Sequence, residues 1–349
     1  MRSGLRTRPW AGLDLGRFSV KLLALQPGVG GARLRAAEVV LPAADAQPDG
    51  AWPAESLARA IGECFSQAGV SPRGCRGISI GVAGPDVIVK HLSLPLLDES
   101  EVAPALRFEA RKHLPFDPQS MVLDFQILGR FPSERKLEIL LAAVSHEHME
   151  RVMAPMRLLG VEPDIVDAAP LALANALMAD HETEPGAHVL VDIGESSSHL
   201  VLFQRGQPFF TRRLDFGGRH LTQAIAEGTR VPPEEAEEWK LAAGADQPGL
   251  RVDWDSAEMN AVLDALRNNL ADELRRSFAF YRTQGTLPEP LRMWVSGGSA
   301  RLPGLATRLG ELLGIPVALF DPFARLGRPD GGRSGPQYAQ AYGLALRSA

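Results

Sequence analysis

The feature that most constrains the fold of this 349-residue chain is an internal repeat. Asp14-Leu-Gly16 precedes Ser19 and an apolar run, and Asp192-Ile-Gly194 precedes Ser197 and a similar run. The two aspartates are 178 residues apart, which is about half of the chain. Self-similarity at such a distance predicts a duplicated architecture with two related halves.

Each copy has the pattern of a β-hairpin. Apolar segments at 10–13 and 19–25 flank the first Asp-x-Gly turn, and segments at 189–193 and 200–203 flank the second. Turns built from small residues leave backbone N–H groups free to bind phosphate. Two such turns facing each other would hold a polyphosphate from both sides.

The polar residues of the repeat suit a metal-bound polyphosphate. Asp14 and Asp192 stand at strand ends, where carboxylates can hold Mg²⁺ through its waters. Lys21, seven residues after Asp14, supplies a point positive charge for phosphate. The chain has only five lysines, so a lysine at this position is informative.

A third glycine turn, Ser296-Gly297-Gly298-Ser299, lies where an apparent strand runs into a helix. Glycine lacks a Cβ, so a flat ligand such as adenine can approach the backbone there. The sequence contains no P-loop and no strand-borne GxGxxG, which disfavours those two kinds of nucleotide site.

Composition excludes several classes of protein. The net charge of −5 gives no electrostatic basis for binding nucleic acid. Two cysteines, Cys64 and Cys75, support neither a disulfide framework nor a zinc site and suit a reducing cytosol. No apolar stretch approaches the roughly 18 residues of a membrane span, and the N-terminus lacks a signal-peptide core. We therefore expect any membrane role to depend on a partner.

A short α/β module interrupts the first half. The pattern predicts a helix at 98–113, strands at 122–128 and 137–144, and a helix at 146–159 that Pro155 interrupts. Further along, a helix at 256–284 carries an apolar stripe that we assign to the core. A loop at 327–336 is predicted to be mobile, and a closing helix at 337–347 follows.

The three glycine motifs resemble the phosphate-1, phosphate-2 and adenosine motifs of the actin/Hsp70/sugar-kinase superfamily. Residues 218–222 and 236–240 resemble that superfamily's elements around ribose and adenine. The module adds a finer resemblance through residues 108–117 and 123–126. With these, residues 10–347 are similar to the PilM family of type IV pilus assembly proteins, which is related to FtsA.

The resemblance implies an α/β, actin-like (ribonuclease H-like) fold with two duplicated lobes and a small inserted α/β subdomain in the first. The implied bounds are 8–93 for the first lobe and 94–160 for the inserted subdomain. The second lobe would span 161–326, and 327–349 would hold a mobile loop and a closing helix that returns to the first lobe.

The resemblance also implies a site for ATP and Mg²⁺, with the metal held through water by Asp14 and Asp192. The nucleotide-binding residues would be Asp14, Gly16, Arg17, Ser19, Lys21, Asp192, Gly194, Ser196, Ser197, Gly217, Gly218, Glu237, Lys240, Gly297, Gly298 and Ser299.

The implied function is that of a cytoplasmic ATP-binding adaptor of the pilus assembly platform. Such a protein captures the N-terminal tail of a PilN-like inner-membrane protein beside the inserted subdomain, and so lies at the membrane. Other assembly components, including motor ATPases, are implied partners. The alternatives are a GspL-like component of type II secretion, a sugar or acid kinase, and an FtsA-like filament protein.

Two departures from the family pattern bear on activity. Bulky Arg17 and Phe18 occupy the first phosphate turn, so they either point away or contact the nucleotide. Ala169 stands where the family often has an acidic residue, which favours ATP binding over turnover, with weak or absent hydrolysis. No catalytic residue is predicted, and His146-Glu-His-Met-Glu150 does not match a metal motif.

Overall fold

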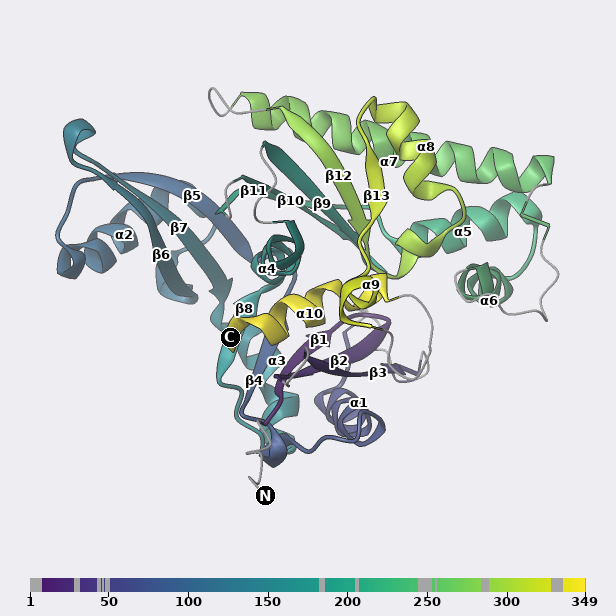
Figure 1. Cartoon of the computed structure of the whole chain (residues 1–349), viewed down its shortest axis with the longest axis horizontal. Coiled ribbons are helices and arrows are strands. Elements are labelled where there is room, and N and C mark those ends of the chain that lie inside the picture. The colour runs from purple at the N-terminus through teal and green to yellow at the C-terminus, as the bar shows by residue number, and fades with distance from the viewer. Residues whose placement is uncertain are drawn as a thin grey trace, which may run out of the picture.

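The computed structural model comprises two lobes and a projecting subdomain (Figure 1). It describes residues 8–27, 32–42, 45, 47, 51–181, 186–204, 207–243, 253–254, 256–283, 289–327 and 335–348. The strands form three sheets, of five, five and three strands.

The first lobe is built on a sheet of order β3-β2-β1-β4-β8. Its strands are β1 (Trp10–Leu15), β2 (Ser19–Gln26), β3 (Arg33–Val40), β4 (Gly77–Val82) and β8 (Ile165–Ala168). β1, β2 and β3 pair antiparallel, whereas β4 lies parallel to both β1 and β8. The central hairpin β1–β2 carries the first Asp-x-Gly turn.

The second lobe repeats this arrangement with the order β11-β10-β9-β12-β13. Its strands are β9 (Ala187–Ile193), β10 (Ser198–Gln204), β11 (Gln207–Leu214), β12 (Pro290–Ser296) and β13 (Val317–Leu319). The parallel and antiparallel pairings match those of the first lobe strand for strand. The duplicated fold predicted from the sequence is therefore confirmed.

Helices α1 (Ala54–Gln67) and α3 (His146–Leu158) pack on the first sheet and share its core. The sequence predicted a break at Pro155, but α3 continues through that residue, and the amide of Leu159 donates to its carbonyl. The predicted interruption is wrong because Pro155 is buried near the helix end, where packing against the sheet outweighs one missing N–H.

The second sheet is covered by helices α5 (Gly218–Thr229) and α7 (Ala257–Arg282), with α6 (Pro233–Ala243) and α8 (Leu305–Leu313) beside them. The apolar stripe of α7 belongs to the core, as predicted. Its buried members are Leu263, Leu266, Leu270 and Leu274.

The inserted subdomain is a three-stranded sheet of order β5-β7-β6 with helix α2 (Glu99–His113). Its strands are β5 (Ile88–Pro95), β6 (Met121–Phe131) and β7 (Lys136–Ser145). β5 was not anticipated, so the sheet begins before residue 94. Helix α3 lies at the other end of the predicted range and packs with the first lobe.

Two helices fill the space between the lobes. Helix α4 (Ala169–His181) and helix α10 (Ala339–Ala345) lie side by side between the two large sheets (Figure 1). α10 contacts β1, β2 and β4 as well, so the closing helix does return to the first lobe. A short helix, α9 (Pro322–Leu326), precedes it; most of the predicted loop at 327–336 lies outside the described residues.

Across the described ranges, none of the helices combines the length and the apolar character that crossing a bilayer requires.

The contact between α4 and α10 depends on glycine at 343. A Cβ on Gly343 would lie 1.7 Å from the carbonyl oxygen of Ala172, a backbone atom that cannot move alone. We expect Gly343→Ala to lower the free energy of unfolding by about 2–3 kcal/mol, measured by chemical denaturation. In contrast, Gly62→Ala in α1 meets only Leu159 Cδ2 at 3.7 Å and should stabilise the protein slightly. Equal stabilities for the two variants would contradict this packing.

Candidate nucleotide-binding site

A cavity of about 1280 Å³ lies between the lobes, and both Asp-x-Gly turns open into it. Of the predicted nucleotide-binding residues, all except Gly217 line this cavity. Residues from the first, second and third glycine motifs, which are far apart in the sequence, therefore share one space. Its size suits a ligand as large as a nucleotide.

The first turn places a carboxylate beside a lysine. Asp14 and Lys21 are register partners across the hairpin, and Lys21 Nζ lies 3.4 Å from Asp14 Oδ2. Burial raises the pKa of Asp14, and Lys21 offsets part of that rise. Burial by itself lowers the pKa of Lys21, but the carboxylates of Asp14, Glu38 and Asp192 raise it on balance. Lys21 therefore remains a cation with no ligand bound.

The second turn is braced by glycines. The amide of Gly194 donates to the Ser197 carbonyl at 3.2 Å, and the amide of Gly218 donates to the Gly194 carbonyl at 2.8 Å. A Cβ on Gly217 would lie 2.5 Å from the Glu195 carbonyl oxygen. Gly217 thus packs behind the turn and supports its shape, while Gly194, Ser196, Ser197 and Gly218 face the cavity.

Asp192 is the second buried carboxylate. Ser296 Oγ donates to Asp192 Oδ1 at 2.7 Å. Burial raises the pKa of Asp192 to about 6, Ser296 opposes that rise, and the charge of Asp14 adds to it. The aspartates of the two hairpins are thus close enough to sense each other's charge.

This pair of carboxylates fits Mg²⁺. A hard cation prefers oxygen ligands, and it would relieve the repulsion between Asp14 and Asp192. Within the described ranges no group of three or more His, Cys, Asp or Glu side chains could form a metal cage. Magnesium held by one or two carboxylates, with water and phosphate completing its shell, is compatible with that.

The other end of the cavity carries a network from α5 and α6. Lys240 Nζ lies 2.6 Å from Glu237 Oε2 and 2.8 Å from Thr222 Oγ1, and Thr222 Oγ1 also hydrogen-bonds Glu237. A Cβ on Gly218 would lie 2.7 Å from Ser299 Oγ and 3.1 Å from Lys240 Nζ. The second and third glycine motifs therefore meet at Gly218, where ribose hydroxyls would find both donors and acceptors.

The bulky residues of the first turn line the cavity rather than pointing away from it. Arg17 is exposed and Phe18 is half-buried. Trp52 Nε1 donates to the Arg17 carbonyl at 2.9 Å, which fixes the segment before α1 against this turn. Both side chains are thus available to a bound ligand.

Sequence reasoning missed several residues of the site. Glu38 accepts a hydrogen bond from Ser19 Oγ at 2.7 Å, and Gln340 Nε2 donates to Asp14 Oδ1 at 2.9 Å. Both come from elements that contain no glycine turn, so no motif marked them. His199 could have been found from the repeat. It is the cross-strand register partner of Asp192, as Lys21 is the partner of Asp14. Burial, reinforced by Arg213, lowers the pKa of His199 to about 4, so it stays neutral.

One wall of the cavity belongs to the root of the inserted subdomain. Asp86, before β5, lies 2.5 Å from His148 Nδ1 and also hydrogen-bonds Ser145 at the end of β7. These contacts join the chain segments that enter and leave the insert. His148 thus forms a carboxylate–imidazole pair with Asp86.

Ala169, where the family often has an acidic residue, is buried at the start of α4 and does not line the cavity.

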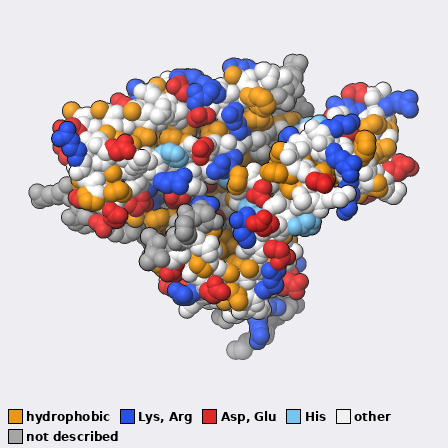
Figure 2. Space-filling model, turned by 180° about the vertical axis from the view of Figure 1, so that it is seen from behind, with side chains coloured by type: hydrophobic (Ala, Val, Ile, Leu, Met, Phe, Trp, Pro, Cys, Tyr) orange, Lys and Arg blue, Asp and Glu red, His pale blue; other side chains and the backbone are white. Residues whose placement is uncertain are grey.

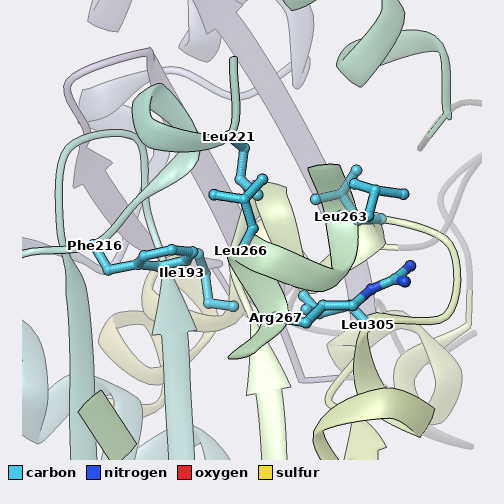
Figure 3. A pocket seen from close by; sticks show the side chains of 8 residues that line it. Ile193, Phe216, Leu221, Leu263, Leu266, Arg267 and Leu305 are labelled. Carbon is cyan, nitrogen blue, oxygen red and sulfur yellow. The ribbon is translucent and has the colours of Figure 1, made fainter. Parts of the chain in front are cut away.

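A second, small void in the second lobe is not a ligand site. Figure 3 shows apolar side chains gathered around it, with the guanidinium of Arg267 directed away, and the lining comes from β9, α5, α7, α8 and the segments before α5 and α8. Its volume of about 10 Å³ is near the minimum for one water, and the lining is apolar apart from Arg267. Arg267 donates to the Pro303 carbonyl instead.

On the face of the molecule shown in Figure 2, basic and acidic side chains are interspersed over the described surface. That distribution suits the net charge of −5.

Comparison with known proteins gives consistent matches over most of the chain. The family model for the type IV pilus assembly protein PilM matches residues 12–349. FtsA, the cell division protein of Pseudomonas aeruginosa, is 26% identical over 328 residues, covering 84% of this chain and 76% of that protein.

Two solved structures extend the comparison. The chain resembles a PilM–PilN type IV pilus biogenesis complex with a TM-score of 0.81 and 28% identity, covering 97% of each chain. It also resembles an MreB of Spiroplasma citri bound to AMPPNP with a TM-score of 0.51 and 13% identity, covering 97% and 96%. At that identity the second likeness concerns the fold alone.

The buried charge of Asp192 should lower the free energy of unfolding of the ligand-free protein. Because burial raises the pKa of Asp192 to about 6, from an ordinary aspartate value of 3.8, the charged form costs the native state about 2–3 kcal/mol above pH 6. We expect Asp192→Asn to raise the free energy of unfolding by about 2 kcal/mol at pH 8, and the gain to fade as pH falls from 6 to 4. Chemical denaturation across pH measures this, and the exposed Asp272→Asn is the control. A gain that grows toward low pH would contradict the assignment.

Proposed function

The chain belongs to the PilM family of type IV pilus assembly proteins, and from this premise we propose that it is an ATP-binding adaptor of the pilus assembly platform. One observation carries the proposal. A single cavity between two equivalent hairpins contains two buried carboxylates, one lysine from the first hairpin and a Lys240–Glu237 network. These are the groups that a magnesium-bound nucleoside triphosphate needs along its length.

In this proposal the phosphates lie between the two hairpins. The turn amides near Gly16 and Gly194 face them, and Lys21 contributes a positive charge. Asp14 and Asp192 would hold Mg²⁺ through its waters, and the ion would neutralise phosphate charge. The nucleotide bound to the MreB structure supports this, since the two chains share the fold.

The nucleoside would lie at the α5–α6 end. Glu237, Lys240 and the glycine turn at Gly297 and Gly298 would contact ribose and adenine. Gly217 would act from behind the second turn.

We propose that binding, rather than turnover, is the role of ATP here. Hydrolysis requires a group that positions the attacking water. Ala169 has no such group and lies outside the cavity. The energy of ATP would then be used as binding energy that fixes the relation of the two lobes.

The partner we propose is the cytoplasmic tail of a PilN-like inner-membrane protein, held beside the inserted subdomain. The likeness to a PilM–PilN complex supports this choice. Such a partner would bring the chain to the membrane surface from the cytoplasm, where motor ATPases and other assembly components are the further partners. The inserted subdomain, from β5 to β7, would supply one side of the groove.

A single lysine substitution tests the nucleotide site. Lys21→Met removes the only lysine of the first hairpin, and we expect ATP affinity in the presence of Mg²⁺ to fall about tenfold to a hundredfold. Isothermal titration calorimetry measures the affinity. Lys112→Met, the same change on the exposed face of α2, should bind like the wild type. Equal affinity for both variants would refute the placement of the phosphates.

A pull-down tests the adaptor role. The purified chain should retain a PilN-like protein from solubilised membranes of its own organism, and retain several times more with ATP and Mg²⁺ than without. Asp14→Ala should lose this nucleotide dependence. If that variant loses ATP binding but retains the partner with ATP as well as the wild type does, nucleotide and partner are not coupled.

A further inference from the structure

Helix α10 connects the first phosphate turn to the root of the inserted subdomain. All of its residues are buried, from Ala339 to Ala345. A Cβ on Gly12 of β1 would lie 2.1 Å from the Ala341 carbonyl oxygen, so strand and helix are in backbone contact. Two backbones packed this closely cannot shift independently.

At its start, α10 contacts the carboxylate of Asp14 in the first hairpin. Gln340 Nε2 donates to Asp14 Oδ1 at 2.9 Å, while the other oxygen of Asp14 faces Lys21. Gln340 is 7% exposed. A Cβ on Gly81 would lie 2.5 Å from Gln340 Nε2, so glycine in β4 leaves the space for this amide. The side chain is therefore fixed on both sides.

Just after α10 ends, the short turn Leu346–Ser348 contacts β8. Arg347 Nε lies 3.0 Å from Asp167 Oδ2, and the Asp167 side chain is 5% exposed. Asp167 is the register partner of Gly81, the residue under Gln340. The two polar contacts of the α10 segment thus lie on β1 and β8, the strands on either side of β4.

Apolar packing joins this second contact to the insert. Ala168, next to Asp167, packs with Val89 of β5 and Leu140 of β7, and Leu128 of β6 packs against the same cluster. Burial raises the pKa of Asp167, Arg347 lowers it, and the charge of Asp124 on β6 adds to the rise. A change in how Arg347 holds Asp167 would therefore alter the surroundings of β6.

We propose that α10 couples the nucleotide site to the inserted subdomain, with Gln340 positioning Asp14 for magnesium and Arg347 passing the state of the helix to Asp167 and β6. The inference rests on the proposed function, because it concerns the response of the same site. Gln340 is a positioning residue, since it acts through Asp14. In this proposal α10 responds to the binding of a magnesium-bound nucleotide. The response is slower amide exchange, and so a more ordered backbone, in β6 of the inserted subdomain.

Two calorimetric titrations test whether Gln340 positions Asp14 for magnesium. Gln340→Met keeps the length of the side chain and removes the donor. We expect the affinity for ADP with Mg²⁺ to fall about tenfold, and the affinity for ADP in EDTA to change less than about twofold. A purely structural defect would lower both affinities together. Gln67→Met on the exposed face of α1 is the matched control and should change neither.

Hydrogen–deuterium exchange of β6 tests whether the contact between Arg347 and Asp167 links the nucleotide site to the insert. In the wild type, ADP with Mg²⁺ should slow amide exchange in Met121–Phe131. Arg347→Met should keep nucleotide affinity within about twofold and lose this slowing. Arg282→Met, an exposed ion-pair residue on α7, should behave as the wild type.

The outcomes separate the two ideas. If the wild type binds neither ADP nor ATP, the proposed function fails, and the coupling fails with it. If the wild type binds but Gln340→Met matches Gln67→Met, or Arg347→Met still shows nucleotide-dependent slowing in β6, the coupling alone is overturned.

Discussion

The structure depends on the burial of two like charges, Asp14 and Asp192, at the ends of two equivalent hairpins. One lysine, Lys21, stands against them, and its counterpart in the second lobe is a neutral histidine, His199. With one cation for two carboxylates, the free site carries an electrostatic cost that burial increases. A divalent cation with a polyphosphate would neutralise it, so the cost of the empty site becomes part of the driving force for binding.

That constraint also explains how the lobes are held together. The carboxylates must stay aligned across a cavity. The space between the two sheets is filled by α4 and α10, two helices rich in small residues. Their backbones meet at Gly343 and Ala172, and α10 meets β1 at Gly12. Close backbone contact transmits displacement better than flexible side chains do, because a packed interior has little free volume. The lobes are therefore connected stiffly beside the cavity that lies between them.

Much of this could be predicted from the sequence because the chemistry of phosphate binding requires local motifs. Asp14, Gly16 and Lys21 lie within eight residues, and the recurrence of the aspartate and glycine as Asp192 and Gly194 predicted both the duplication and the cavity. Glu38 and Gln340 could not be found in this way, because they reach the site from β3 and α10 through tertiary pairing alone. The break predicted at Pro155 was wrong for a related reason. The low helix propensity of proline was outweighed by the packing of α3 on the sheet.

The position of the insert gives the fold its functional asymmetry. Both lobes carry equivalent sheets, but the three-stranded insert lies in the first, between β4 and its parallel neighbour β8. Asp86 lines the cavity and hydrogen-bonds Ser145, so it joins the two ends of the insert at the cavity wall. Asp167 lies on β8, on the other side of β4 from the first hairpin, and pairs with Arg347. The insert therefore borders the cavity at its root, while its link to the α10 segment runs through β8, where Ala168 packs with Val89 and Leu140.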